Sequence, residues 1–258
     1  MFRSSNPALG ANAFSQVSPY GGETMSIQGT VNKSFALLFL VFSGAWWIWE
    51  KIIQPTPILF EEQASANMEA VTPFIFGGLI IGMIMALVTI FKKEWSMFTA
   101  PVYAIAEGFV LGGISAIFEM SYPGIVMQAV ALTFGTLFCL LMGYKSGLIK
   151  LTDKMRAGIV AATGAIFLVY LVSFIMSFFG AGIPLIHGSG PIGIGFSLIV
   201  VGVAALNLIL DFELIERGAM QGAPRYMEWY GAFALMVTLI WLYINLLRLL
   251  SKIYGRRR

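Results

Sequence analysis

The sequence contains very few of the side chains on which metal sites and many enzymes depend. Its 258 residues include one cysteine and one histidine. Cys139 lies inside an apolar run, so the sequence predicts no disulfide framework, and we interpret this thiol as a packing residue. His187 has neither a cysteine nor a cluster of acids near it in the sequence, so neither a zinc site nor a histidine-dependent triad is supported. We therefore do not expect an enzyme.

Charged residues are also scarce. They make up 11% of the chain, against about 25% in soluble domains, and hydrophobic residues make up 58%. This composition excludes a soluble fold and indicates an integral membrane protein in contact with the lipid bilayer. The formal net charge is +3, but the cations lie in loops and at the C-terminal end, where membrane topology accounts for them. We expect no nucleic-acid binding and no cofactor.

Apolar stretches long enough to cross a bilayer recur along the chain. A spanning segment must satisfy its own backbone hydrogen bonds, and unbroken apolar runs of about 20 residues predict helices. We predict an all-α polytopic membrane protein with seven transmembrane helices. The predicted spans cover residues 34–52, 73–91, 98–118, 125–144, 157–179, 192–211 and 229–249. Residues 1–32, rich in Ser, Asn and Gly, are expected to form a flexible tail before a single membrane domain at 33–258.

The distribution of lysine and arginine predicts the orientation. The tail and every second loop carry the basic residues, and the alternate loops carry only Lys51. This asymmetry places the N-terminus in the cytoplasm. Seven full spans then place the basic C-terminal end outside, unless one late segment fails to cross; we favour full crossing.

With this orientation the outer side is acidic. Glu61, Glu62 and Glu69 follow the first predicted span. An acidic rim would concentrate cations, calcium in particular, at the entrance of a pathway. The alternative is a solvated acidic loop with no pathway behind it, and charge alone favours that alternative.

The third predicted span, APVYAIAEGFVLGGISAIFE, combines a bare ridge with a buried acid. Ala104, Gly108, Gly112 and Ser115 recur at helical spacing, which predicts that a neighbouring helix approaches closely. Glu107 stands beside this ridge, well inside the membrane. A carboxylate at that depth must be protonated, paired or facing water, so we interpret it as a functional group rather than a structural one.

Asp211 ends the sixth predicted span and has two interpretations. Taken by itself, it is an interfacial acid solvated by headgroup water and neutralised by Arg217 or Arg225; the other reading is a working group. In the seventh span, polar side chains recur on one face at Thr238, Asn245 and Arg248. These side chains either line a polar seam or hold helices together by hydrogen bonds.

Several segments together resemble the Bax inhibitor-1/YccA-like family, in its bacterial branch. They are RSSNPAL, MSIQGTVNKS, APVYAIAEGFVLGGISAIFE, LNLILDFELIERG and APRYMEWYGAFALMVTLIWLYINLLRLL. The resemblance implies seven helices with the last one surrounded by two groups of three. It also implies a bacterial inner-membrane location and a proton-sensitive calcium leak gated by two aspartates that share a proton. Some bacterial relatives are instead linked to control of a membrane AAA protease.

The resemblance assigns Asp211 to the first family aspartate and places Thr238 at the position of the second. A proton shared between two aspartates cannot be carried over intact. Glu228, at the start of the last span, is one candidate partner for Asp211. Glu107 is the other.

These observations lead to two hypotheses. The first is a proton-modulated passive leak for Ca2+ or other cations, with Asp211 at an inner gate, Glu107 as an intramembrane site, and Glu228, Thr238 and Asn245 beside the pathway. The second is a non-conducting regulatory protein that binds a membrane AAA protease or another membrane partner through its tail and lipid-facing helices.

Overall fold

The computed structural model describes residues 23–53, 60–179, 188 and 190–257, and these residues form seven long α-helices. The helices are α1 (Ile27–Ile52), α2 (Phe60–Phe91), α3 (Ser96–Ser121), α4 (Ile125–Lys145), α5 (Asp153–Phe178), α7 (Pro191–Met220) and α8 (Met227–Arg257), with a short 3-10 turn, η1 (Lys93–Trp95), before α3. All seven are long and apolar enough to cross a membrane, which confirms the predicted fold class. The RSSNPAL segment and His187 lie outside the described residues.

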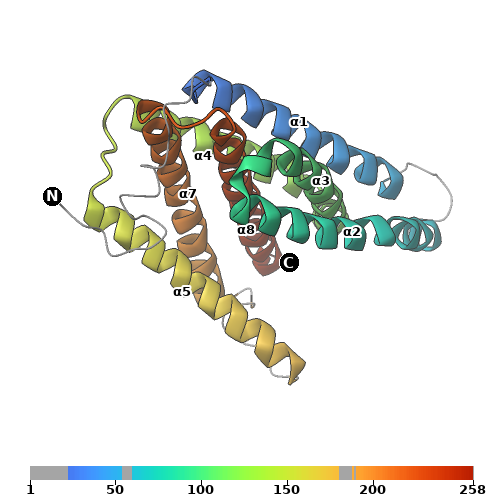
Figure 1. Ribbon diagram of the computed structural model, residues 1–258. Helices are drawn as coiled ribbons and strands as arrows, with labels where there is room; N and C mark the ends of the chain where they lie inside the picture. The colour runs from blue at the N-terminus through green and yellow to red at the C-terminus, as the bar shows by residue number, and fades with distance from the viewer. Residues whose placement is uncertain (1–22, 54–59, 180–187, 189, 258) are drawn as a thin grey trace.

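The last helix occupies the centre of the bundle. Helices α1, α2 and α3 lie on one side of α8, and α4, α5 and α7 lie on the other (Figure 1). α8 contacts α1, α3, α4 and α7. Its side chains enter two apolar cores: Phe233 and Met236 pack with α1 and α3, and Leu242 and Leu247 pack with α4 and α7. The predicted central position of the last helix is therefore confirmed.

Local sequence signals set where several helices begin. Ser26 caps α1, its hydroxyl accepting from the Gly29 N–H at 2.9 Å, and Thr152 caps α5 in the same way through Met155 at 3.2 Å. Pro191 opens α7, where its missing N–H costs nothing. Such polar caps satisfy backbone donors that apolar lipid cannot satisfy.

Close packing of α1 on α3 depends on the bare ridge of α3. A Cβ atom on Gly108 would lie 2.5 Å from the carbonyl oxygen of Val41, and one on Gly112 would lie 2.6 Å from that of Ala45. No real side chain tolerates such distances. The neighbouring helix predicted from the small residues of this span is therefore α1.

The helices extend further than the apolar runs that predicted them. α1 begins at Ile27, inside the segment expected to be tail, and α2 begins at Phe60. The largest difference is in α7: the predicted span ends at Asp211, whereas the helix continues to Met220. Hydropathy falls where the charges of DFELIERG begin, but those charges are satisfied by neighbouring helices, so the helix continues through them.

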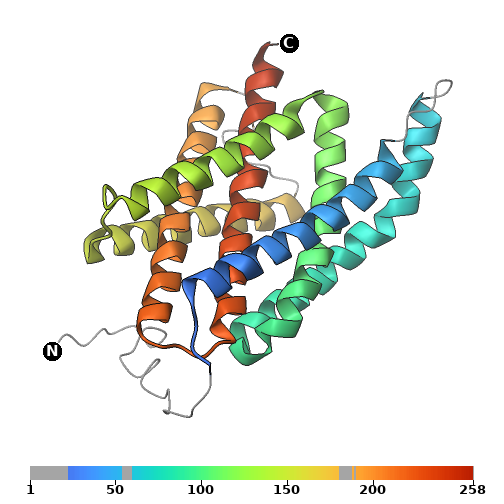
Figure 2. The same ribbon diagram turned by 90° about the horizontal axis from the view of Figure 1, so that it is seen from above.

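Helix ends gather at two opposite sides of the bundle. At one side, Thr24 forms a bridge with Pro224, and the Ser96 hydroxyl donates to the Tyr226 carbonyl at 3.1 Å. At the other, the Tyr254 hydroxyl donates to the Gln128 side chain at 3.0 Å. α8 runs from the side where α1 begins to the opposite side (Figure 2). It is long enough for the full crossing that we favoured; which side faces the cytoplasm remains a prediction. Below, the side where α1 begins is called the inner side.

Candidate functional site

Asp211 lies inside the bundle, more than two helical turns before the end of α7. Its Oδ2 atom is buried and has no hydrogen-bond partner among the described residues. A buried, unpaired acceptor costs about 1–3 kcal/mol. A position held at such a cost is a candidate for function and not for anchoring at the membrane surface.

Thr238 of α8 faces this carboxyl group. Its hydroxyl interacts with Asp211 and also donates to the Ala234 carbonyl, one turn earlier, at 3.2 Å. Thr238, the residue that the resemblance aligned with a second aspartate, thus lies beside Asp211 and offers it a hydroxyl group.

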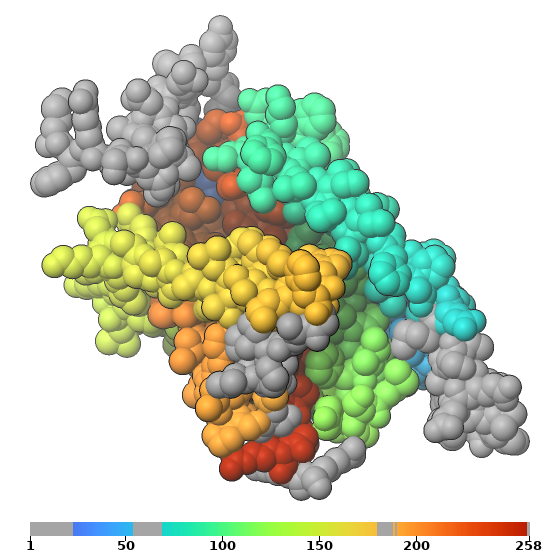
Figure 3. Space-filling view, turned by 90° about the horizontal axis from the view of Figure 1, so that it is seen from below, coloured from blue at the N-terminus to red at the C-terminus, as the bar shows by residue number. Residues whose placement is uncertain are grey.

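Further polar side chains continue this contact along the bundle. Asn207, one turn before Asp211, donates to the Thr163 hydroxyl of α5 at 2.8 Å. Asn245, two turns after Thr238, is 3% exposed and accepts from the Tyr170 hydroxyl of α5 at 3.3 Å. We call the resulting row the polar seam; it consists of Thr163 and Tyr170 of α5, Asn207 and Asp211 of α7, and Thr238 and Asn245 of α8. α5 lies across α7 (Figure 3), and its Thr163 and Tyr170 side chains bond to Asn207 and Asn245.

Cations end the polar seam on the outer side. The Arg248 guanidinium lies 5.7 Å from the Tyr170 ring centroid. The Lys252 ammonium donates to the Gly193 carbonyl at 3.1 Å and to the Ser197 hydroxyl at 2.8 Å, both on α7. These two cationic side chains hold α8 against α5 and α7 at the outer end of the seam.

Of the three glutamates expected to form an acidic outer rim, Glu69 has a described side chain, and those of Glu61 and Glu62 lie outside the described residues. Glu69 is exposed on α2, which packs against α1 and α3. The end of α1 and the start of α2 splay away from α8 (Figure 2). Arg248 and Lys252 are the charged residues that contact α5 and α7 at the outer end of the seam.

The two glutamates of the DFELIERG motif bind the inner end of α7 to the inner ends of α5 and α4. Glu213 accepts from Arg156 of α5 at 2.6 and 3.1 Å and pairs with Arg217 at 2.7 Å. Glu216 accepts from the Tyr144 hydroxyl of α4. The motif thus points Asp211 into the bundle and sends its glutamates to α5 and α4.

The arginines expected to neutralise an interfacial Asp211 bind other acids. Arg217 pairs with Glu213, and Arg225 pairs with Glu23. The interfacial interpretation of Asp211 therefore does not describe this structure.

Glu228 is engaged elsewhere as well. It is 3% exposed and accepts from the Ser26 backbone N–H at 2.8 Å, from the Ser26 hydroxyl at 2.9 Å, and from the Lys33 ammonium. Close to these contacts, the Met25 backbone N–H donates to the Ala223 carbonyl at 2.7 Å. Glu228 thus joins the start of α1 to the start of α8, and Thr238 rather than Glu228 is the side chain found beside Asp211.

Glu107 faces α2. A Cβ atom on Gly82 of α2 would lie 3.4 Å from Glu107 Oε2, and Tyr103 lies one turn earlier on α3. Glu107 is therefore separated from the polar seam, and the structure does not bring it together with Asp211.

A comparison with protein-family models supplies the assignment. The model described as Bax inhibitor 1 like matches residues 6–255, nearly the whole chain. The chain belongs to the Bax inhibitor 1-like family. Searches of curated proteins and of solved structures returned no match.

Sequence reasoning missed several residues of the polar seam. Thr163, Tyr170 and Asn207 were not singled out, although each is a polar residue inside an apolar run. The available signal was spacing: polar residues recur seven apart on α5 and α8 and four apart on α7, spacings that bring side chains to the same face of a helix. Among the described residues, no cluster of three or more His, Cys, Asp or Glu could hold a metal ion.

Proposed function

We propose that this protein is a passive, proton-modulated pathway for cations, with Ca2+ as the principal ion and Asp211 as the proton-sensitive group. The single observation that carries the proposal is the buried Oδ2 of Asp211, which has no hydrogen-bond partner in the described chain. Membership of the Bax inhibitor 1-like family supports it. The proposed location is a bacterial inner membrane, with the N-terminus in the cytoplasm.

The two protonation states of Asp211 favour different arrangements. When protonated, the carboxyl group can donate to the Thr238 hydroxyl, whose own hydrogen is directed at Ala234. When ionised, Asp211 can accept from the Thr238 hydroxyl at one oxygen, but its buried Oδ2 needs a further donor, water or a cation, which no described residue of the packed seam supplies. A change in pH therefore shifts an equilibrium between a packed and a hydrated seam.

The outer cations set the resting state of this pathway. Lys252 and Arg248 close the seam and repel an approaching cation, so their contacts must loosen before an ion passes. Glu107, separated from the seam, is proposed as a second intramembrane acid that binds a proton or a cation on the α2 side of α3. Glu228 is proposed to hold the inner end of the pathway together.

The test is Ca2+ flux in proteoliposomes between about pH 5 and about pH 8. Asparagine has the shape of a protonated aspartate, so Asp211→Asn should show, at every pH, the flux that the unmodified protein shows at the acid limit. Glu94→Gln, an exposed acid at the inner surface, is the matched control and should keep the full pH response. Flux that matches empty liposomes at every pH would contradict the proposal.

A regulatory function is the alternative, and one observation favours it. Residues 23–26 bind the turn between α7 and α8 on the inner side. In this alternative, residues 1–22, which precede them in the sequence, bind a membrane AAA protease. Deletion of residues 1–22 should abolish control of that partner and leave ion flux unchanged if both functions exist.

A further inference from the structure

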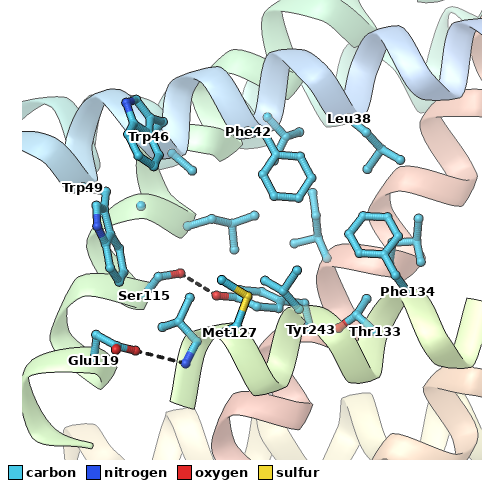
Figure 4. A pocket seen from close by; sticks show the side chains of 18 residues that line it. Leu38, Phe42, Trp46, Trp49, Ser115, Glu119, Met127, Thr133, Phe134 and Tyr243 are labelled. Atoms are coloured by element: carbon cyan, nitrogen blue, oxygen red, sulfur yellow. Dashed lines mark hydrogen bonds between the residues drawn. The ribbon is translucent and has the colours of Figure 1, made fainter. Parts of the chain in front are cut away.

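An apolar groove lies between α1 and α4, on the opposite side of α8 from the polar seam. It has a volume of about 510 Å³, and α3 and α8 form its floor (Figure 4). Leu239, Ile240 and Tyr243 of α8 point into it, whereas Thr238 points to Asp211. The groove is therefore a separate feature of the central helix.

The groove opens on the surface that faces lipid. Its rim residues Phe42, Trp46 and Met127 are 47%, 68% and 73% exposed. All of them belong to membrane-spanning helices. An apolar cavity that opens sideways at this depth meets hydrocarbon chains and not water.

One polar feature interrupts the apolar floor. The Ser115 and Tyr243 hydroxyls lie 2.7 Å apart (Figure 4). A bond between two hydroxyls uses one hydrogen, so the other remains to be donated. At the outer end, both oxygens of Glu119 accept backbone N–H groups, from Gly124 at 2.6 Å and Val126 at 3.1 Å. The hydroxyl pair is therefore the donor that a ligand would meet on the floor of the groove, whereas the indole N–H groups of Trp46 and Trp49 lie on its α1 wall.

The depth of this donor fits a particular part of a lipid. α3 has 26 residues and a length of roughly 39 Å, which exceeds a hydrocarbon core of about 30 Å. Ser115 lies less than two turns before the end of α3, close to the outer boundary of the core. Acyl ester carbonyls, which accept hydrogen bonds, lie between the headgroups and the chains of a phospholipid.

We propose that the groove binds one diacyl phospholipid of the bilayer. One acyl chain lies between α1 and α4, and its ester carbonyl accepts a hydrogen bond from the Ser115–Tyr243 pair. Trp46 and Trp49 flank the chain at the level where indole rings favour the membrane interface. This site does not depend on ion conduction.

The experiment uses the full chain in nanodiscs that contain a phosphatidylcholine with a photoactivatable diazirine in one acyl chain. Cross-linked peptides are identified by mass spectrometry. We expect labelling concentrated on the groove residues of α1 and α4. Val130→Trp fills the groove and should lower that labelling roughly five-fold or more, the effect of losing about one favourable contact. The matched control Leu132→Trp, a lipid-facing position on the same helix outside the groove, should leave it unchanged.

A competition experiment tests the carbonyl. An unlabelled diester lipid should displace the probe roughly five-fold better than a dialkyl ether lipid with the same chains, because the ether lacks the acceptor. The double variant Ser115→Ala, Tyr243→Phe should remove this preference. Equal competition by the ether lipid, or labelling spread evenly over the lipid-facing surface, would each overturn the proposal.

Discussion

The contact between Lys33 and Glu228 permits the most quantitative prediction. Glu228 is 4% exposed at its side chain and Lys33 is 17% exposed, so neither charge is well solvated. Breaking a buried ion pair by removing one partner costs about 3–5 kcal/mol. Lys33→Met leaves Glu228 with the two donors of Ser26, which reduces the loss, and we expect a decrease of about 2 kcal/mol in the free energy of unfolding.

The measurement is unfolding in mixed micelles by a denaturing detergent, followed by tryptophan fluorescence. Lys92→Met is the matched control, because Lys92 is exposed at the end of α2; it should change the free energy by less than about 0.5 kcal/mol. Combining Lys33→Met with Glu228→Gln removes both charges, so the double variant should lose less than the sum of the single losses, with a coupling of about 1–2 kcal/mol. If Lys33→Met lowers the free energy of unfolding no more than Lys92→Met does, the Lys33–Glu228 pair does not stabilise the inner side of the bundle.

Two further predictions concern helix packing and the outer cations. Gly108→Leu should lower the unfolding free energy by about 3 kcal/mol or prevent folding, because its Cβ would meet the Val41 carbonyl at 2.5 Å. Gly135→Leu, whose Cβ would meet no atom within 4 Å, should be tolerated in the same unfolding assay. Arg248→Gln should raise Ca2+ flux severalfold in proteoliposomes, because it removes a cation from the outer end of the polar seam; unchanged flux would show that ions do not pass this end.

Much of the architecture was predictable because lipid leaves the backbone few choices. Apolar length identified all seven helices, and the small residues of the third span identified a close helix contact. The ends of the helices were less predictable. Hydropathy treats Glu213 and Glu216 as the end of a span, but Arg156 and Tyr144 satisfy them and α7 continues.

The candidate site was only partly predictable for a related reason. Asp211 and Thr238 were singled out, and the structure places them together. The partners proposed for Asp211 were other carboxylates, because sequence shows that Glu228 and Glu107 exist and does not show which way they face. Glu228 turns to Lys33, almost two hundred residues earlier in the chain, and Glu107 turns to α2. The direction in which a side chain faces depends on how its helix is rotated relative to its neighbours. The spacing of residues within one helix does not determine that rotation.

The attachment of residues 23–26 and Lys33 to the start of α8 has a consequence for how the protein is made. A membrane protein enters the bilayer from its N-terminus, so α1 is inserted while the acid that will pair with Lys33 is still unsynthesised. Throughout that interval Lys33 must stay at the headgroup level. The inner face can close only when α8, the helix at the centre of the bundle, arrives last. Insertion of α8 thus completes the two apolar cores and the contacts of residues 23–26 and Lys33 in a single step. A chain truncated before α8 would lack both.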